Sequence, residues 1–305
     1  MNDLGPHATE HIGYRRSAAI VGLEILDAYH CPRDWRMVAD DYAISFLHTW
    51  RGRVTYRGRV DAVEPGIAFC NYPGDALIAT PEANSAGSFN VLMVEEELMR
   101  QWVDEYQLRA RRPEWRAIYP RIPDEVQTRF QSVSGSLTPQ TSALQLQSAS
   151  AELSEALVRG MVAGASDRAP SSGPAIRGTA RMRECLNEAG FDVDLETLAR
   201  TAGMSKFQAL RAFKRRYGLP PHEYQMCLRI ALARRSLLAG VPQAEVAAHC
   251  GFVDQSHMIR HFKRIVGVTP MRYVGSRSRR GLDDDARRAL HQASSLVERG
   301  DWHRS

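Results

Sequence analysis

A short pattern near the carboxyl end of the chain occurs twice and constrains the fold more than any other feature. The stretch "FKRRYGLPPHEY" at 213–224 returns as "FKRIVGVTPMRY" at 262–273, 49 residues later. Each copy follows the same order of elements: a short apolar helical stretch, a glycine, a residue able to cap a helix, and a basic helical stretch. The repeat therefore predicts two copies of one helical unit.

Two short helices joined at a glycine by a turn of a few residues form a helix-turn-helix, whose second helix enters the major groove of DNA. The first unit contains "LARTAGMSKFQALRAFK" and the second "VAAHCGFVDQSHMIRHFK", which has one additional residue in its turn. A predicted helix over 221–239, ended by Gly240, separates them. One such match is weak evidence, but two matches on either side of a long helix predict an all-α double helix-turn-helix domain.

Each predicted second helix has an apolar side and a basic side, because successive residues on a helix are turned by about 100°. In 205–217 the apolar side consists of Ala209, Ala212, Phe213 and Tyr217, and in 254–266 it consists of Met258, Phe262 and Val266. Ser205 and Gln208 match the Ser-x-x-Gln capping box, and Asp254 suits an N-cap. Both stretches are thus predicted to be helices held by one face, with the other face free.

The positive charge of the chain is concentrated in this region. Residues 176–276 hold 16 Lys and Arg against 8 Asp and Glu, whereas residues 1–175 hold 17 against 22. The only three lysines, Lys206, Lys214 and Lys263, lie in the two predicted second helices. A local basic excess is expected of a segment that meets a polyanion, although a solvated basic surface is an equal alternative on charge alone.

Side-chain chemistry divides these helices into two kinds of predicted DNA contact. Arginine can pair with guanine and glutamine with adenine through two hydrogen bonds, each worth about 1–3 kcal/mol of discrimination. The predicted contacts to base edges are Phe207, Leu210, Arg211, Gln255, Ser256, His257 and Arg260. The predicted contacts to phosphates are Lys206, Lys214, Arg215, Lys263 and Arg264. For any single residue, a solvated helix surface is the competing interpretation.

The segment 176–274 resembles the DNA-binding domain of the AraC/XylS family of bacterial transcription regulators. The resemblance rests on "LARTAGMSKFQALRAFKRRYGLPPHEY" and "VAAHCGFVDQSHMIRHFKRIVGVTPMRY", while Ala209 and Leu210 depart from the family's pattern. It implies a sequence-specific DNA-binding regulator that is not an enzyme, needs no cofactor, and has promoter or operator double-stranded DNA, a small-molecule effector, a second copy of the chain and RNA polymerase as partners.

The amino-terminal part is predicted to be a β-structure followed by helices. From Ile20 to Val94, short β-branched and aromatic runs are separated by Pro and Gly turns, which indicates a sandwich or small barrel. Helical stripes follow after Val94 and over 140–162; the second is the better candidate for dimerisation. The family resemblance implies a cupin-like effector-binding barrel here, and hence an α+β multidomain chain. Candidate effector-binding residues are Trp35, Arg36, His48, Trp50, Tyr56 and Tyr72.

The expected domains are 1–163 for effector binding and dimerisation, a linker at 164–175, the DNA-binding domain at 176–276 and an extension at 277–305. The five cysteines have no metal-site spacing, and the scattered histidines do not form the ligand cluster of a catalytic cupin. The sequence shows no signal peptide or membrane span, so a cytoplasmic protein is expected. Two alternatives stay open: a cupin metalloenzyme with a DNA-binding module, and a regulator whose barrel only dimerises.

Overall fold

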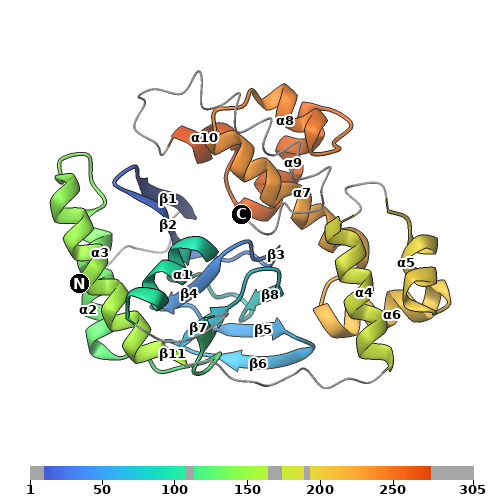
Figure 1. The fold of residues 1–305 in the computed structure, drawn as a ribbon, viewed down its shortest axis with the longest axis horizontal. Coiled ribbons are helices and arrows are strands. Elements are labelled where there is room, and N and C mark those ends of the chain that lie inside the picture. The colour runs from blue at the N-terminus through green and yellow to red at the C-terminus, as the bar shows by residue number, and fades with distance from the viewer. Residues whose placement is uncertain (1–9, 107–112, 164–173, 189–192, 276–305) are drawn as a thin grey trace.

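The computed structural model describes residues 10–106, 113–163, 174–188 and 193–275 (Figure 1). The predicted linker, apart from its last two residues, and the predicted extension lie outside these ranges. The strands of the amino-terminal half are β1 (His11–Ser17), β2 (Ile20–Cys31), β3 (Trp35–Val38), β4 (Tyr42–Leu47), β5 (Gly52–Tyr56), β6 (Arg59–Val63), β7 (Ala68–Asn71), β8 (Ala76–Pro81) and β9 (Gly87–Val94).

These strands form two antiparallel sheets. Within the described residues, one sheet has the order β1-β2-β9-β4-β7 and the other has the order β3-β8-β5-β6. The α+β class expected from the sequence is confirmed, but the sheets are not hydrogen-bonded into the closed barrel that was expected. The reason is visible in the pairing: β7 and β1, at the edges of the first sheet, pair with no strand of the second.

Both faces of the first sheet are buried. On β4, Ile44 and Phe46 pack toward helices, and Phe46 stacks on Phe130 with ring centroids 4.0 Å apart. The alternate residues Ala43 and Leu47 face the second sheet. The predicted alternation of side chains along this strand is therefore correct. Its two sets of side chains face two different apolar cores, and neither set faces solvent.

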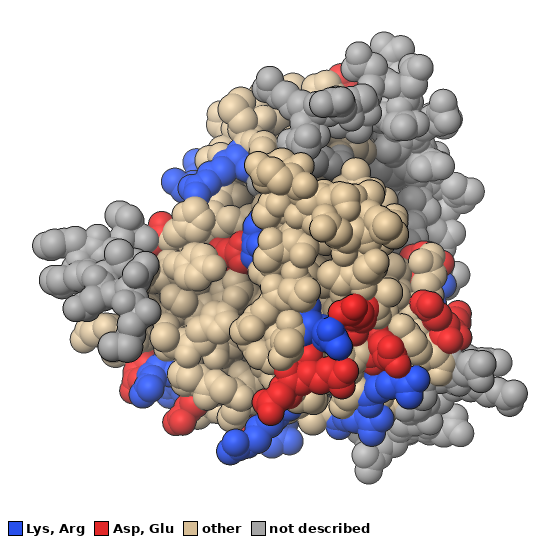
Figure 2. Space-filling model, turned by 90° about the vertical axis from the view of Figure 1, so that its left-hand side faces the viewer, with Lys and Arg blue, Asp and Glu red and all other residues tan. Residues whose placement is uncertain are grey.

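Three helices cover the outer face of the first sheet: α1 (Glu96–Glu105), α2 (Asp124–Ser136) and α3 (Ala143–Met161). A short ribbon of β10 (Glu114–Trp115) and β11 (Val162–Ala163) completes this half. The stripe that was proposed for dimerisation, Leu146, Leu153, Leu157 and Met161, is buried inside the protomer. Figure 2 shows the molecule from the side of α2 and α3, where acidic and basic side chains are intermingled.

Every regular element among the described residues of the carboxyl-terminal half is a helix. This half consists of α4 (Pro174–Glu188), α5 (Leu195–Ala202), α6 (Lys206–Tyr217), α7 (Pro221–Leu238), α8 (Gln243–His249), α9 (Gln255–Val266) and α10 (Pro270–Gly275). Figure 1 shows α4 to α6 at one end of α7 and α8 to α10 at the other. One apolar cluster runs from the space between the sheets through α7 into both helical groups. Most of α7 is buried, so this helix joins the two halves as well as the two helix-turn-helix units.

Candidate nucleic-acid interface and interdomain cavity

The two predicted second helices begin at capped turns. Ser205 and Gln208 form a reciprocal capping box at α6, with nitrogen-to-oxygen distances of 3.3 and 3.0 Å. At α9, the Asp254 carboxylate accepts a hydrogen bond from the backbone N–H of His257 at 2.6 Å. Each preceding helix ends at a glycine in the left-handed region, Gly203 with φ 66° and Gly251 with φ 70°. The local signals that predicted these turns are thus present in the structure.

Each helix is held by the face that the sequence predicted. On α6, Ala209 and Phe213 are fully buried, and the Phe213 ring meets Tyr224 of α7 edge to face at 5.5 Å. On α9, Met258 and Phe262 are fully buried. Apolar burial on one side fixes the rotation of both helices and leaves the opposite side to solvent.

Nearly all of the predicted DNA contacts lie on the free sides. The exposed residues are Lys206, Phe207, Leu210, Arg211, Lys214 and Arg215 on α6, and Gln255, Ser256, Arg260, Lys263 and Arg264 on α9. Phe207 is 78% exposed, which is unusual for a phenylalanine and provides an apolar surface beside Arg211. Lys206 forms an exposed ion pair with Glu196 at 2.9 Å.

His257 is placed differently from the other predicted base contacts. It is half-buried, and its ring lies 5.6 Å from the Phe252 ring and 4.6 Å from the His261 ring. Burial and the nearby positive charge of Arg264 lower the pKa of His261 to about 4, so this imidazole is neutral at pH 7. The two histidines therefore pack the start of α9 against the preceding turn.

The carboxyl ends of both helices meet the amino-terminal half. A Cβ atom added at Gly58, in the turn between β5 and β6, would lie 2.6 Å from the Arg215 carbonyl oxygen at the end of α6. The Tyr14 hydroxyl of β1 donates to the Val266 carbonyl at the end of α9 at 2.8 Å. Because the two carboxyl ends dock on the sheets, the first turns of α6 and α9, with their polar and basic side chains, extend away from them.

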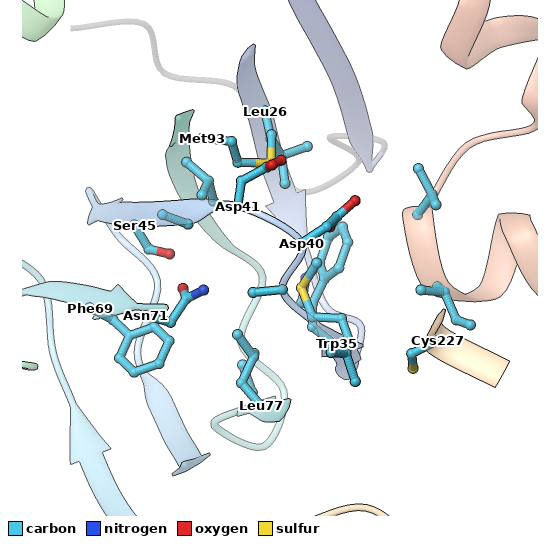
Figure 3. A pocket seen from close by; sticks show the side chains of 18 of the residues that line it. Leu26, Trp35, Asp40, Asp41, Ser45, Phe69, Asn71, Leu77, Met93 and Cys227 are labelled. Carbon is cyan, nitrogen blue, oxygen red and sulfur yellow. The ribbon is translucent and has the colours of Figure 1, made fainter. Parts of the chain in front are cut away.

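A cavity lies between the two sheets and is closed on one side by the helical half (Figure 3). Its enclosed volume is about 90 Å³, and about 1010 Å³ of empty space surrounds it when the part open to solvent is included. Its walls are mostly apolar and aromatic. The helical half contributes Cys227, Ile230, Ala231 and Arg234 from α7, and Ile265 and Val266 from α9.

Two of the six residues proposed for effector binding, Trp35 and Trp50, line this cavity. The other four do not. Arg36 pairs with Glu223 at 3.6 Å, His48 is exposed beside Asn90, Tyr56 donates to Asp75 at 2.5 Å, and Tyr72 packs on Tyr42 and Trp115. Aromatic content alone did not distinguish the inner face of a strand from its outer face or its ends.

A charged cluster that the sequence did not predict lies at the border of the two halves. Arg234 is buried and donates to both Asp40 oxygens at 2.8 and 2.9 Å, to Glu24 at 2.6 Å and to the Tyr273 hydroxyl at 3.0 Å. Burial disfavours its charge, but Asp40, Tyr273 and Glu24 outweigh this effect and raise its pKa well above the usual value. The pair of arginines within the mostly apolar "ALARRSLL" stretch was the available signal.

Asp41 also lines the cavity, next to this cluster. Burial and the neighbouring Asp40 charge raise its pKa to about 8, and Arg234 opposes the shift only in part. Asp41 has no hydrogen-bond or ion-pair partner among the described residues.

No group of three or more His, Cys, Asp or Glu side chains in the described ranges could hold a metal ion. No helix in the same ranges is both long and apolar enough to cross a bilayer.

Comparison with known proteins shows that the carboxyl-terminal part of the chain is similar to helix-turn-helix proteins. A family model described as a helix-turn-helix domain matches residues 198–276. The chain is 39% identical over 67 residues to the uncharacterized HTH-type transcriptional regulator YbfI of Bacillus subtilis (strain 168), covering 22% of this chain and 24% of that protein. It is 32% identical over 82 residues to the probable transcriptional regulator LumQ of Photobacterium leiognathi, covering 27% and 33%.

The match thus spans about a quarter to a third of the length of these relatives. Among solved structures, ToxT from Vibrio cholerae aligns over 85% of this chain and 100% of its own, with a TM-score of 0.44 and 10% identity. The sequence repeat, the paired capped helices and the family match lead to one conclusion. Residues 198–276 form a helix-turn-helix domain.

Proposed function

We propose that this protein is a sequence-specific DNA-binding transcription regulator of the AraC/XylS type, controlled by a small molecule in its amino-terminal half. The observation that carries the proposal is the pair of capped helices α6 and α9, each held by its apolar face and each exposing basic side chains. They lie at opposite ends of α7, whose 18 residues span about 27 Å. Successive major-groove faces of DNA are about 34 Å apart, and in this proposal α6 and α9 enter two neighbouring turns.

In this proposal the two helices make different contacts. Gln255, Ser256 and Arg260 lie toward the start of α9 and on its outward face, where a helix in the groove meets base edges. On α6, Arg211 offers hydrogen bonds, while Phe207 and Leu210 offer apolar contact, the chemistry that suits the methyl group of thymine. The remaining proposed contacts, Lys206, Lys214, Arg215, Lys263 and Arg264, neutralise phosphates. His257 is proposed at the edge of the contact.

Selection from a random duplex library, followed by footprinting of the recovered sequences, tests the DNA-binding proposal. The expected result is a defined sequence with two protected major-groove segments per protomer, about one helical turn or 10 bp apart. Equal affinity for selected and unselected duplexes in the presence of competitor DNA would refute sequence-specific binding.

The proposed effector site is the interdomain cavity. Its walls come from both halves, so a molecule bound there contacts the sheets and the long helix that carries both helix-turn-helix units. A ligand that fits one arrangement of the two halves better than another shifts their equilibrium by its difference in affinity. Screening by thermal shift checks this, because a ligand that binds only the native state raises Tm. A chain whose amino-terminal half only dimerises would show no such shift.

A homodimer and contact with RNA polymerase complete the proposal. Because the apolar stripe of α3 is buried within the protomer, the dimer would use other surfaces of the amino-terminal half. Light scattering of the full chain at micromolar concentration tests the dimer, and run-off transcription from a selected site tests the effect on polymerase.

A further inference from the structure

The charges around the interdomain cavity do not balance when Asp41 is ionised. The positive charges are those of Arg16 and Arg234, and the negative charges are those of Glu24, Asp40 and ionised Asp41. Arg235 and Glu95, which also act on Asp41, add one charge of each sign. Arg234 is the cation that lines the cavity, and its guanidinium already donates to Asp40, Glu24 and Tyr273. With Asp41 ionised, the negative charges therefore exceed the positive ones by one, which disfavours an anionic ligand in this cluster.

Asp41 is the unpaired member of the cluster. It is partly buried, lines the cavity, and has no hydrogen bond or ion pair with any described residue. The charged groups that act on it are Asp40, Arg234 and Arg235, together with Glu95. In its ionised form, a carboxylate held this way lacks the counter-charge that normally accompanies burial. A protonated amine in the cavity would supply that charge and a charge-assisted hydrogen bond.

Asn71 places a second polar group without a hydrogen-bond partner at the same cavity. The residue is 2% exposed, and its side-chain Nδ2 has no hydrogen-bond partner within the described structure. Figure 3 shows the Asn71 and Ser45 side chains directed into the cavity from the first sheet, and Asp40 and Asp41 elsewhere on its wall. A buried N–H without an acceptor is costly, and an uncharged oxygen on a ligand would accept from it.

The remaining wall favours an apolar molecule. Trp35, Phe69 and Phe89 contribute aromatic rings, and the wall between them is largely aliphatic. Aromatic faces also attract cations, so they suit an ammonium group better than a carboxylate.

We propose that the cavity binds an apolar amine that carries an uncharged oxygen, with its ammonium group at Asp41 and its oxygen at Asn71. This inference rests on the proposed effector function of the cavity and specifies the chemical class of the effector.

Three probes with one skeleton test the ammonium end: 4-phenoxybutylamine, 4-phenoxybutan-1-ol and 4-phenoxybutanoic acid. Titration calorimetry with the full chain at pH 8.5, above the pKa of Asp41, measures their affinities. We expect the amine to bind at least about tenfold more tightly than the acid. In Asp41→Asn, which preserves side-chain size, the affinities for amine and alcohol should agree within about twofold, whereas the exposed control Glu82→Gln should behave as wild type.

A fourth probe, 5-phenylpentylamine, replaces the ether oxygen of 4-phenoxybutylamine by CH₂. It tests the proposed hydrogen bond between the ligand oxygen and Asn71. The wild-type chain should prefer the ether, and Asn71→Leu should abolish or reverse that preference. Circular dichroism and binding to the selected duplex establish that each variant is folded.

Three outcomes would overturn the inference: acid binding as tight as amine binding, an unchanged amine preference in Asp41→Asn, or no binding of any probe. DNA binding by the same samples separates the two proposals. Sequence-specific DNA binding without amine binding refutes the ligand class alone, whereas loss of sequence-specific DNA binding refutes the proposed function.

Discussion

Replacing Arg234 by leucine tests whether the buried charge cluster holds the two halves together. Glu24 keeps an ion pair with Arg16, but Asp40, with its side chain 11% exposed, has no other ion-pair partner within the described residues. Removing one member of a buried ion pair costs about 3–5 kcal/mol because the other charge is left buried and unpaired. We therefore expect the free energy of unfolding of Arg234→Leu to fall by about 3–5 kcal/mol, mainly through Asp40.

The assay is urea denaturation at pH 7, followed both by far-UV circular dichroism and by tryptophan fluorescence, whose signal includes Trp35 and Trp50 in the cavity wall among the five tryptophans of the chain. The double variant Arg234→Leu/Asp40→Asn should recover much of the loss, because the amide carries no charge to bury. A loss below about 1 kcal/mol for the single variant, or no recovery in the double variant, would show that the cluster is too hydrated for this reasoning.

Three further predictions concern docking, pH and DNA. Gly58→Ala should lower Tm more than Gly66→Ala, because both glycines have positive φ (78° and 84°) but only the Cβ at position 58 would meet the end of α6; equal losses would exclude a docking role. The pKa of Asp41 is raised from 3.8 to about 8, so the native state holds a proton that the unfolded state releases. The stabilisation of the native state by this proton is complete below pH 4 and is lost as pH rises through 8. Urea titrations at several pH values should show this pH dependence in the wild-type chain but not in Asp41→Asn. Arg260→Ala should weaken binding to the selected duplex by about 1–3 kcal/mol and hardly affect random DNA, whereas Lys263→Ala should weaken both and reduce the salt slope by about 1 in filter-binding assays.

The helix-turn-helix units could be predicted from the sequence because their determinants are local. Ser205, Asp254 and the glycines that end the preceding helices act within a few residues of themselves, through caps and backbone conformation. The apolar stripe of each second helix follows from helix periodicity, and the buried residues Phe213 and Phe262 lie where that period placed them. Because the pattern occurs twice, 49 residues apart, a motif that is weak evidence alone predicted two helix-turn-helix units.

The cavity and its chemistry were decided by tertiary structure. Arg234 meets Asp40 and Glu24 across separations of 194 and 210 residues, and no local signal specifies such pairs. Strand alternation identified two sets of side chains on β4 but not which set faced the cavity, since both are apolar and both are buried. The sequence by itself determined where the two helix-turn-helix units lie and which face of each second helix is buried. The packing of α7 against the two sheets determined what encloses the cavity and which charges meet there, because long-range contacts depend on how whole elements pack.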